Sequence, residues 1–402
     1  MSDDPFERWN LTPVINASGT MTSLGASRVQ PETRALVDRI LDSFVDIDEL
    51  QSRAGAVIAR LTGAEAGCIT ACSAAAMTQA VAACLTGTDL AGIEALPETD
   101  GENRVILPMG HMVNYGAPVD QAIRLAGASV VPIGTAAACE TWHLRRALEE
   151  GAAAAMYVVS HHTVRENELP MDLFISLCRE HDVPVIVDMA SEYDLRGPIA
   201  LGASAVIYSG HKFLSGVTSG IVAGSEDLVR AIYLQHRGIG RTMKAGKESV
   251  VGAMAALQRW ETRDHDAERV LEEARVERWL EVLSKIPGLD LSRHADWTGN
   301  PITRLKIVVL PEEARAYAWE VATRLAVRNP RIVLRDDLVE HGELYLDPCN
   351  VTDDEAEITA FAIAEEMQRF RDEGDGLRRS WSEVKRAREE GILKWNGGGD
   401  PA

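Results

Sequence analysis

The sequence predicts an α/β protein in which a mostly parallel sheet is sandwiched by helices, with a smaller α+β C-terminal domain. The first observation is that, over about residues 104–224, short β-branched runs alternate with stretches that carry apolar residues at helical spacing. Such alternation is typical of parallel strands covered by helices on both faces. The second observation is the length of 402 residues, 46% of them hydrophobic, which exceeds what one core usually holds.

The predicted elements of the large domain follow one another in order. Strands are expected at residues 104–108, 129–133, 155–160, 183–188, 205–209 and 220–223. Residues 171–181 predict a helix between two of them, because apolar side chains recur there every three or four positions. The carboxyl ends of parallel strands meet at one edge of a sheet, and a ligand is expected at that edge.

A long helical pattern over residues 250–283 is expected to link the two domains. Beyond it, strands are predicted at residues 304–310, 331–334 and 343–346, and helices at 314–327 and 353–371. The expected division is an N-terminal segment lining the site (1–30), a large domain (31–255), a small domain (256–371) and a peripheral C-terminal tail (372–402). The tail is expected to form a helix and a frayed end.

Composition narrows the class of protein. The formal net charge of −20 repels phosphate backbones, so nucleic acid is not an expected partner. No run approaches the roughly 18 apolar residues of a membrane span, and MSDDPFERWN has no secretory signal. The six cysteines lack CxxC spacing, which favours reduced thiols in the cytoplasm over disulfides or a metal site.

Three strand ends carry residue types that one cofactor needs together. VPVIVDMASE places Asp188 directly after an apolar strand, and YSGHKF places Lys212 one strand–helix–strand unit later. ACSAAAM places small residues, Ser73 to Ala75, at the start of a helix. Pyridoxal 5'-phosphate (PLP) requires a lysine for its Schiff base, a carboxylate for its ring nitrogen and helix N-terminal amides for its phosphate. Ser209 would add a hydroxyl group to that phosphate site.

Each of these features also has a structural explanation. An aspartate after a buried strand often caps a helix, a lysine there is often solvated, and small residues often serve close helix packing. AGKES at 245–249 lacks the hydroxyl residue and the earlier glycine of a P-loop, so no nucleotide site is predicted. From the residues alone, a PLP enzyme and a protein without this cofactor both stay open.

Five stretches in one order resemble the SelA-like family. They are INASGTMTSLGAS (15–27), CSAAAMTQAVAACLTGTD (72–89), IVDMASE (186–192), GASAVIYSGHKFLSGVTSGIVAG (202–224) and GIGRTMKAGKESVVGAMAAL (238–257). These are PLP enzymes of the aspartate-aminotransferase fold (fold type I), including bacterial selenocysteine synthase and the D-glucosaminate-6-phosphate ammonia-lyase group. The resemblance implies this fold and this cofactor, and is much less specific for the substrate.

The resemblance gives roles to the residues at the strand ends. Lys212 would form the Schiff base, and Asp188 would bind the pyridine nitrogen. The phosphate ligands would be Ser73, Ala74, Ala75 and Ser209. Enzymes of this fold borrow phosphate ligands across a subunit interface, so Thr218 in TSG would serve a neighbouring subunit, although a tight turn explains it nearly as well. A homo-oligomer with shared active sites, a dimer or larger, is therefore expected.

Four histidines are further candidates. His111 in PMGHMVNYGAPV would lie over the face of the cofactor ring, the alternative being a solvent-facing loop histidine. One of His161 and His162, which end YVVSHH, would contact the phenolic oxygen of the cofactor or act on the substrate; histidines satisfied by the backbone are an equal alternative. His211, next to the lysine, would protonate a leaving group.

The substrate carboxylate would be bound by an arginine, whose planar fork suits a carboxylate. The candidates are Arg335, Arg241, Arg28 and Arg53, and the sequence does not decide among them. Asn16, Thr20 and Thr22 of the N-terminal segment would line the site, with an ordinary capping role as the equal alternative.

The resemblance is strongest to the ammonia-lyase branch, around SGHK and GIGRTMKAGKE. It implies a carbon–oxygen lyase that removes the Cα proton of a hydroxylated amino acid, eliminates at Cβ and yields a 2-oxo acid and ammonia. A racemase or epimerase and a retro-aldol lyase are alternatives, since they share the first steps. A tRNA substrate fits the acidic chain poorly, and a non-catalytic binding protein is a remote alternative.

Overall fold

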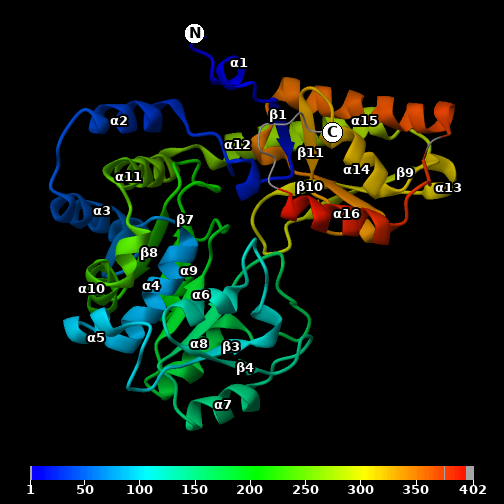
Figure 1. Cartoon of the computed structure of the whole chain (residues 1–402). Helices are drawn as coiled ribbons and strands as arrows, with labels where there is room; N and C mark the ends of the chain where they lie inside the picture. The colour runs from blue at the N-terminus through cyan, green and yellow to red at the C-terminus, as the bar shows by residue number, and fades with distance from the viewer. Residues whose placement is uncertain (1, 375, 395–402) are drawn as a thin grey trace. The chain divides into compact units, whose positions relative to one another are not determined.

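The computed structural model describes residues 2–374 and 376–394 (Figure 1). Its contacts divide the chain into two compact units, Gly25–Arg263 and the chain on either side of that range. The last residues of the predicted tail, 395–402, where a frayed end was expected, lie outside the described residues. Among the described residues, no helix is both long and apolar enough to cross a membrane.

The first unit, Gly25–Arg263, contains a seven-stranded sheet in the order β2-β8-β7-β6-β5-β3-β4. The strands are β2 (Ala66–Thr70), β3 (Arg104–Pro108), β4 (Ser129–Ile133), β5 (Ala154–Val158), β6 (Val185–Asp188), β7 (Ala205–Ser209) and β8 (Gly220–Gly224). From β7 to β4 all neighbours are parallel, whereas β8 is antiparallel to both β7 and β2. The predicted mostly parallel sheet is therefore present.

Helices cover both faces of this sheet (Figure 1). The helices of the unit are α2 (Pro31–Leu41), α3 (Ile47–Thr62), α4 (Ser73–Thr86), α5 (Leu90–Ala95), α6 (Val119–Leu125), α7 (Thr141–Glu149), α8 (Met171–Glu180), α9 (Gly197–Leu201), α10 (Glu226–Leu234) and α11 (Lys247–Thr262), with short 3-10 turns η2 (Met109–His111), η3 (Gln235–Arg237) and η4 (Ile239–Met243). On β7, Ala205 and Ile207 pack with α4, α6 and α10, while Val206 and Tyr208 pack with α3, α8 and α11. Side chains alternate between faces along a strand, and both faces are buried, so these strands appear in the sequence as continuous apolar runs.

The other unit contains two small sheets around a separate core. β1 (Val14–Ala17) pairs in parallel with β11 (Arg331–Leu334), and β12 (Glu343–Leu346), β10 (Thr303–Val309) and β9 (Leu289–Ala295) form an antiparallel sheet. Its helices are α1 (Pro5–Trp9), α12 (His265–Leu283), α13 (Pro311–Ala314), α14 (Ala318–Ala326), α15 (Asp353–Glu373) and α16 (Trp381–Leu393), with turns η1 (Thr22–Leu24), η5 (Val339–His341) and η6 (Pro348–Asn350). The mixture of strands and helices agrees with the predicted α+β class.

One predicted helix is interrupted, and another begins later than predicted. The pattern over 250–283 forms α11 and α12, because Asp264 caps α12 by accepting hydrogen bonds from the amides of Asp266 and Ala267. The helix predicted over 314–327 begins at Ala318, as α14, because Arg315 adopts a left-handed conformation (φ 57°) that ends the short α13 at Ala314. An amphipathic pattern continues across a cap of this kind, so periodicity alone did not reveal either boundary.

The strand predictions differ from the structure mainly at the end of one strand and the start of another, and three strands were not predicted. β5 ends at Val158 rather than 160, and β6 begins at Val185 rather than 183. β1, β2 and β9 were not predicted. β2 is the short, small-residue run AGCIT, and β9 is exposed along much of its length, so neither shows the strong apolar pattern that identifies a strand.

Candidate active site

The predicted site residues of the first unit lie at one edge of its sheet. The parallel strands β3, β5, β6 and β7 all end there, and the antiparallel β8 begins there. β2 runs antiparallel to β8 and therefore ends at the same edge, which places the start of α4 nearby. The register pairs Gly220 with both Ser209 and Thr70, so residues far apart in sequence become neighbours.

Lys212 lies in the loop between β7 and β8, and glycine keeps that loop tight. The amide of Gly210 donates to the carbonyl of Ser219 (2.9 Å), and its carbonyl accepts from the amide of Gly216 (2.8 Å). A Cβ atom on Gly210 would lie 2.0 Å from Ser219 Oγ, so a side chain there would force the buried Ser219 to move. The glycine two residues before the lysine therefore suits the fold of the loop itself.

Aromatic rings fix the residue that follows the lysine. The Phe213 ring meets the Tyr193 ring edge-on with centroids 4.6 Å apart, and Tyr193 meets Trp260 in the same way at 4.8 Å. Such edge-to-face pairs add to the burial of the rings. Phe213 is thus held against the sheet, which restricts where the half-buried Lys212 side chain begins.

Asp188 ends β6 and is 7% exposed. Burial raises the pKa of its carboxyl to about 6, although the positive charge of Lys212 and the amide of Ala190, which donates to Oδ1 (3.2 Å), both act to lower it. Within the part of the chain that the structure describes, Oδ2 receives no hydrogen bond. A buried carboxylate with one open oxygen near an amine is costly unless a ligand completes it.

The first turn of α4 supplies amide groups at the same edge. Cys72 caps the helix, and its Sγ accepts from the amide of Ala75 (3.4 Å). The amides of Ser73 and Ala74 occupy helix positions that have no intrahelical acceptor, so they are available to an anion. A Cβ atom on Gly220 would lie 2.3 Å from the Cys72 carbonyl oxygen, which shows how closely β8 approaches this turn.

Ser209 and His211 are bonded to each other. Ser209 Oγ lies 3.0 Å from Nδ1 of the buried His211, and Ser27 Oγ donates to the carbonyl of His211 (2.6 Å). Burial lowers the pKa of His211, and the charge of Lys212 lowers it further. A neutral imidazole is therefore favoured at this position. Thr218, in the same loop, is exposed, and the neighbouring Ser219 is buried.

The other predicted histidines follow β3 and β5. His111 is buried in the turn η2, and its Nδ1 accepts a hydrogen bond from the amide of Val158 (3.2 Å). Because Val158 pairs with Asp188 across β5 and β6, His111 and Asp188 lie at the ends of β3 and β6, the strands on either side of β5. His161 and His162 lie beyond β5 with ring centroids 3.8 Å apart, His161 half-buried and His162 exposed.

Tyr115 was missed by the sequence analysis. Burial, together with the charges of Asp188 and Cys72, raises the pKa of its hydroxyl to about 12, so the phenol lies within electrostatic reach of both. Tyr115 stands four residues after His111 in PMGHMVNYGAPV, behind the carboxyl end of β3. Its place after a strand end was the available signal.

Arg335, Asn16 and Thr20 belong to the other unit. Arg335 is 8% exposed, its Nε donates to the carbonyl of Ser18 (3.2 Å), and its guanidinium lies over the Trp297 ring at 5.2 Å. Burial lowers its pKa. Among the described residues, its two Nη groups have no hydrogen-bond acceptor. Asn16 stabilises the turn that carries the Ser18 carbonyl. It donates to the carbonyl of Gly19 (2.8 Å) and accepts from the amide of Ser18 (3.1 Å).

A second arginine of that unit is paired with two carboxylates. Arg304 is 2% exposed, its Nε donates to Asp347 Oδ2 (2.7 Å), and its Nη1 donates to Asp296. Burial would lower the pKa of Arg304, but Asp347 and Asp296 raise it well above its usual value. Trp297 also lies over this guanidinium, at 5.1 Å. Arg335, in contrast, forms no ion pair with a carboxylate among the described residues, so its Nη groups are left for a ligand.

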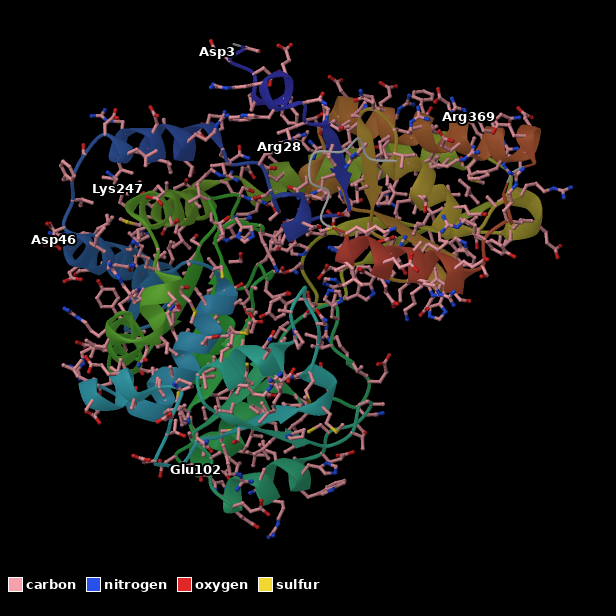
Figure 2. All side chains as sticks on the ribbon, viewed as in Figure 1. Asp3, Arg28, Asp46, Glu102, Lys247 and Arg369 are labelled. Carbon is pink, nitrogen blue, oxygen red and sulfur yellow. The ribbon has the colours of Figure 1, made fainter. Side chains whose placement is uncertain are left out.

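The remaining candidates are more exposed. Arg241 is exposed on η4, and Arg53 is exposed on α3 within 3.7 Å of Glu49. Figure 2 shows Arg28 in the segment that leads into α2. The same figure shows Lys247 at the start of α11, where its Nζ donates to the carbonyls of Leu41 and Ser43. The lysine of AGKES therefore connects two helices, which agrees with the absence of a predicted nucleotide site there.

Comparison with known proteins decides the family. Residues 14–285 match the family SelA, described as L-seryl-tRNA selenium transferase. The chain belongs to the SelA family. One member, the D-glucosaminate-6-phosphate ammonia lyase of Salmonella typhimurium, is 37% identical over 91% of this chain and 98% of its own length. Another, the 5'-C-glycyluridine monooxygenase-decarboxylase of a Streptomyces species, is 35% identical over 85% of this chain and 87% of its own.

Structural comparison agrees with the sequence match. A solved structure of a D-glucosaminate-6-phosphate ammonia-lyase superposes with a TM-score of 0.83 at 36% identity, covering 92% of this chain and 99% of the other. Aspartate aminotransferase from Thermus thermophilus gives a TM-score of 0.56 at 16% identity, covering 89% and 93%, which establishes the shared fold. The predicted family, fold type and relationship to a lyase-type enzyme are confirmed.

Enzymes of the SelA family and of this fold depend on PLP, and the residues of this chain fit that cofactor. The open oxygen of Asp188 suits a protonated ring nitrogen, and the unbonded amides of Ser73 and Ala74 suit a phosphate. Lys212 lies within the electrostatic reach of Asp188, as a lysine that binds the cofactor aldehyde requires.

Proposed function

We propose that this SelA-family member is a PLP-dependent ammonia-lyase for an amino acid that carries a hydroxyl group at Cβ. The observation that carries the proposal is the buried Asp188 with one open oxygen beside Lys212, at the sheet edge where α4 also begins. Support for the reaction class comes from the ammonia lyase that is 37% identical over nearly all of both chains.

The residues divide the work between holding the cofactor and moving protons. Lys212 would bind the cofactor aldehyde, and Asp188 would accept a hydrogen bond from its ring nitrogen. The phosphate would be held by the first-turn amides of Ser73, Ala74 and Ala75, by Ser209, and by Thr218 of a neighbouring subunit. His111 would lie against the ring. When bound, PLP supplies an electron sink for the charge left at the substrate Cα.

The reaction needs one base and one acid from the chain. The Lys212 amine would remove the Cα proton, and the Cβ–O bond would break as a histidine protonates the leaving hydroxyl. His161 and His162 are candidates for this acid. His211, next to the lysine, is a third candidate, and it would first take up a proton because its neutral form is favoured. One water leaves and one water is taken up on hydrolysis, so a 2-amino-3-hydroxy acid gives a 2-oxo-3-deoxy acid and ammonia.

Arg335 is proposed to bind the substrate carboxylate. Its open Nη groups and its support by Ser18 and Trp297 suit a bidentate, charge-assisted contact. Asn16 shapes the turn beside it, Thr20 follows that turn, and Arg241 is a second, exposed candidate. The predicted domain boundaries and the N-terminal segment lining the site stay predictions.

The partners and the compartment are also proposals. A homo-oligomer is proposed because Thr218 is exposed and would bind the cofactor phosphate of a neighbouring subunit. Six free cysteines suit the cytoplasm. The L-seryl-tRNA(Sec) selenium transferase of Escherichia fergusonii is 28% identical over 62% of this chain and 56% of its own length. The net charge of −20 favours a free amino acid over a tRNA substrate.

A second reaction has a specific observation in its favour. The relative named as a monooxygenase-decarboxylase is 35% identical, almost as similar as the ammonia lyase. Loss of the carboxyl group as CO2 would therefore compete with loss of the Cβ hydroxyl. Racemisation and retro-aldol cleavage remain as alternatives because they also begin at Cα.

The test is a substrate screen with the purified full chain and PLP. D- and L-3-hydroxy amino acids, including sugar-derived ones, are assayed for 2-oxo acid, ammonia, CO2, O2 uptake and deuterium exchange at Cα. The proposal predicts equal amounts of 2-oxo acid and ammonia, with a loss of at least about 10³-fold in Lys212→Ala. Lys244→Ala, which alters an exposed lysine, is the matched control. CO2 release with O2 uptake, or exchange without net elimination, would overturn the lyase assignment.

A further inference from the structure

The ring of His111 is held at one nitrogen by the backbone. Nδ1 accepts a hydrogen bond from the amide of Val158 (3.2 Å), and the side chain is 2% exposed. Because an N–H group already points at Nδ1, a neutral ring must carry its proton on Nε2. The direction of Nε2 therefore decides what else His111 can bond.

Nε2 points toward a carboxylate. Glu168 Oε2 lies 3.7 Å from His111 Nε2, an ion-pair distance that is longer than a formed hydrogen bond. The other oxygen, Oε1, accepts from Arg165 Nε at 3.3 Å. Burial alone would raise the pKa of Glu168, but His111 and Arg165 outweigh it and lower the pKa. An ionised carboxylate thus faces the one ring nitrogen that can donate.

The segment that carries Glu168 is fixed to the turn that carries His111. The amide of Val164 donates to the carbonyl of Gly110 (3.1 Å), so the loop after β5 is bonded to η2. The Tyr157 ring meets the His111 ring edge-on at 4.4 Å, and its hydroxyl donates to the carbonyl of Leu169 (3.1 Å). These contacts lie on both sides of Glu168 and leave the carboxylate little freedom to move away.

We propose that Glu168 is a positioning residue that holds the His111 ring in one orientation through its Nε2–H. The proposal rests on the proposed function for the role of the ring, which is to lie flat against the cofactor. A histidine that is hydrogen-bonded at Nδ1 and faces an ionised carboxylate at Nε2 is held against rotation about its Cβ–Cγ bond, and outer partners of this kind orient functional histidines in many sites. Without Glu168, the ring would keep its Val158 contact but lose the second anchor.

The first test needs no cofactor. The full chain is labelled at histidine with 15N, the ring N–H signals are recorded by NMR, and His111→Gln assigns the signal of His111. A ring N–H on Nε2 that exchanges slowly with water is expected. Glu168→Ala should make that proton exchange about tenfold faster or more. Glu168→Gln should retain slow exchange, because its amide oxygen still accepts. Glu166→Ala, an exposed glutamate of the same loop, is the matched control.

The second readout is the reaction itself. In Glu168→Ala, kcat/KM should fall by about tenfold or more, and Glu168→Gln should recover most of the loss. Three results would overturn the inference: a proton on Nδ1 in the unaltered chain, unchanged exchange in Glu168→Ala, or an equal loss of kcat/KM in Glu166→Ala. Failure of the chain to take up PLP would overturn the proposed function and leave the exchange measurement valid, so the two failures are distinguishable.

Discussion

Asp188 and Asp347 are both buried at the end of a strand, yet their electrostatic environments are opposite. Asp188, in the unit of the seven-stranded sheet, has one open oxygen and a pKa raised to about 6 by burial. Asp347, in the other unit, is fully buried, bonds Arg304 and accepts from the amide of Cys349 (3.0 Å). Burial alone would raise the pKa of Asp347, but Arg304 and then Arg335 lower it.

The difference separates a residue that holds the fold from one prepared for a ligand. The pairs around Asp347 satisfy the buried charges within the chain, so removing one partner should destabilise the unit. Without the cofactor, the buried ionised carboxylate of Asp188 lowers the stability of the chain. A ligand N–H group that binds the open oxygen would favour this ionised form. The same contrast divides the two arginines beside Trp297, because Arg304 is paired and Arg335 has open donors.

The largest expected effect on stability is at Arg304, the arginine that is paired with two buried carboxylates. Arg304→Met should lower the free energy of unfolding by about 3–5 kcal/mol, because it leaves Asp296 and Asp347 buried without their counter-ion. Chemical denaturation monitored by the fluorescence of the tryptophans gives the value. If Arg304→Met proves as stable as the unaltered chain, the cluster is not what holds this unit together.

An effect of opposite sign is expected at Asp188. Without PLP, Asp188→Asn should raise the free energy of unfolding at pH 7.5 by about 2–3 kcal/mol, since the carboxyl pKa moves from 3.8 to about 6 on folding. Between these values the folded chain binds more protons than the unfolded chain. Stability from this group is therefore complete below pH 3.8 and is lost as the pH rises through 6.

The measurement compares denaturation of Asp188→Asn and the unaltered chain across pH 3.5 to 7.5. The gain should vanish at the acidic end, whereas PLP uptake should be impaired in Asp188→Asn at every pH. A gain that does not depend on pH would mean that packing, and not charge, distinguishes the variant.

The smallest effect on stability is expected at Arg335. Arg335→Met should change the free energy of unfolding by about 1 kcal/mol, because the lost interactions are one hydrogen bond to Ser18, the stacking on Trp297 and the attraction to Asp347, which Arg304 still pairs. It should raise KM for the amino acid by about tenfold to a hundredfold, the cost of a charge-assisted pair. A large loss of stability with an unchanged KM would make Arg335 a structural arginine like Arg304.

Much of the fold could be predicted from local sequence. The strands at 104–108 and 205–209 have the predicted bounds, because strands buried on both faces are continuous apolar runs. The helix boundaries at Asp264 and Arg315 could not be predicted, because a cap interrupts the backbone without interrupting the apolar pattern. β9 was not predicted, because most of its side chains are exposed or only partly buried.

For the candidate site, the order of the motifs identified residues, but the sequence did not show which side chains would contact one another. Lys212 and Asp188 were named from their places after predicted strands, and the first turn of α4 was named from its small residues; the sheet brings all three to one edge. The sequence did not distinguish Arg335 from the other arginines. It also gave no sign that Glu168 faces His111, since these residues are 57 positions apart.

The sequence by itself determined the family, the parallel sheet and the residue types at the strand ends, because these depend on local patterns and on motifs in a fixed order. Only the tertiary structure decided which buried charges are satisfied. Asp188 has an open oxygen and Asp347 does not, and that difference depends on partners from distant segments. Burial and pairing act through space, so they exist only after the chain has folded.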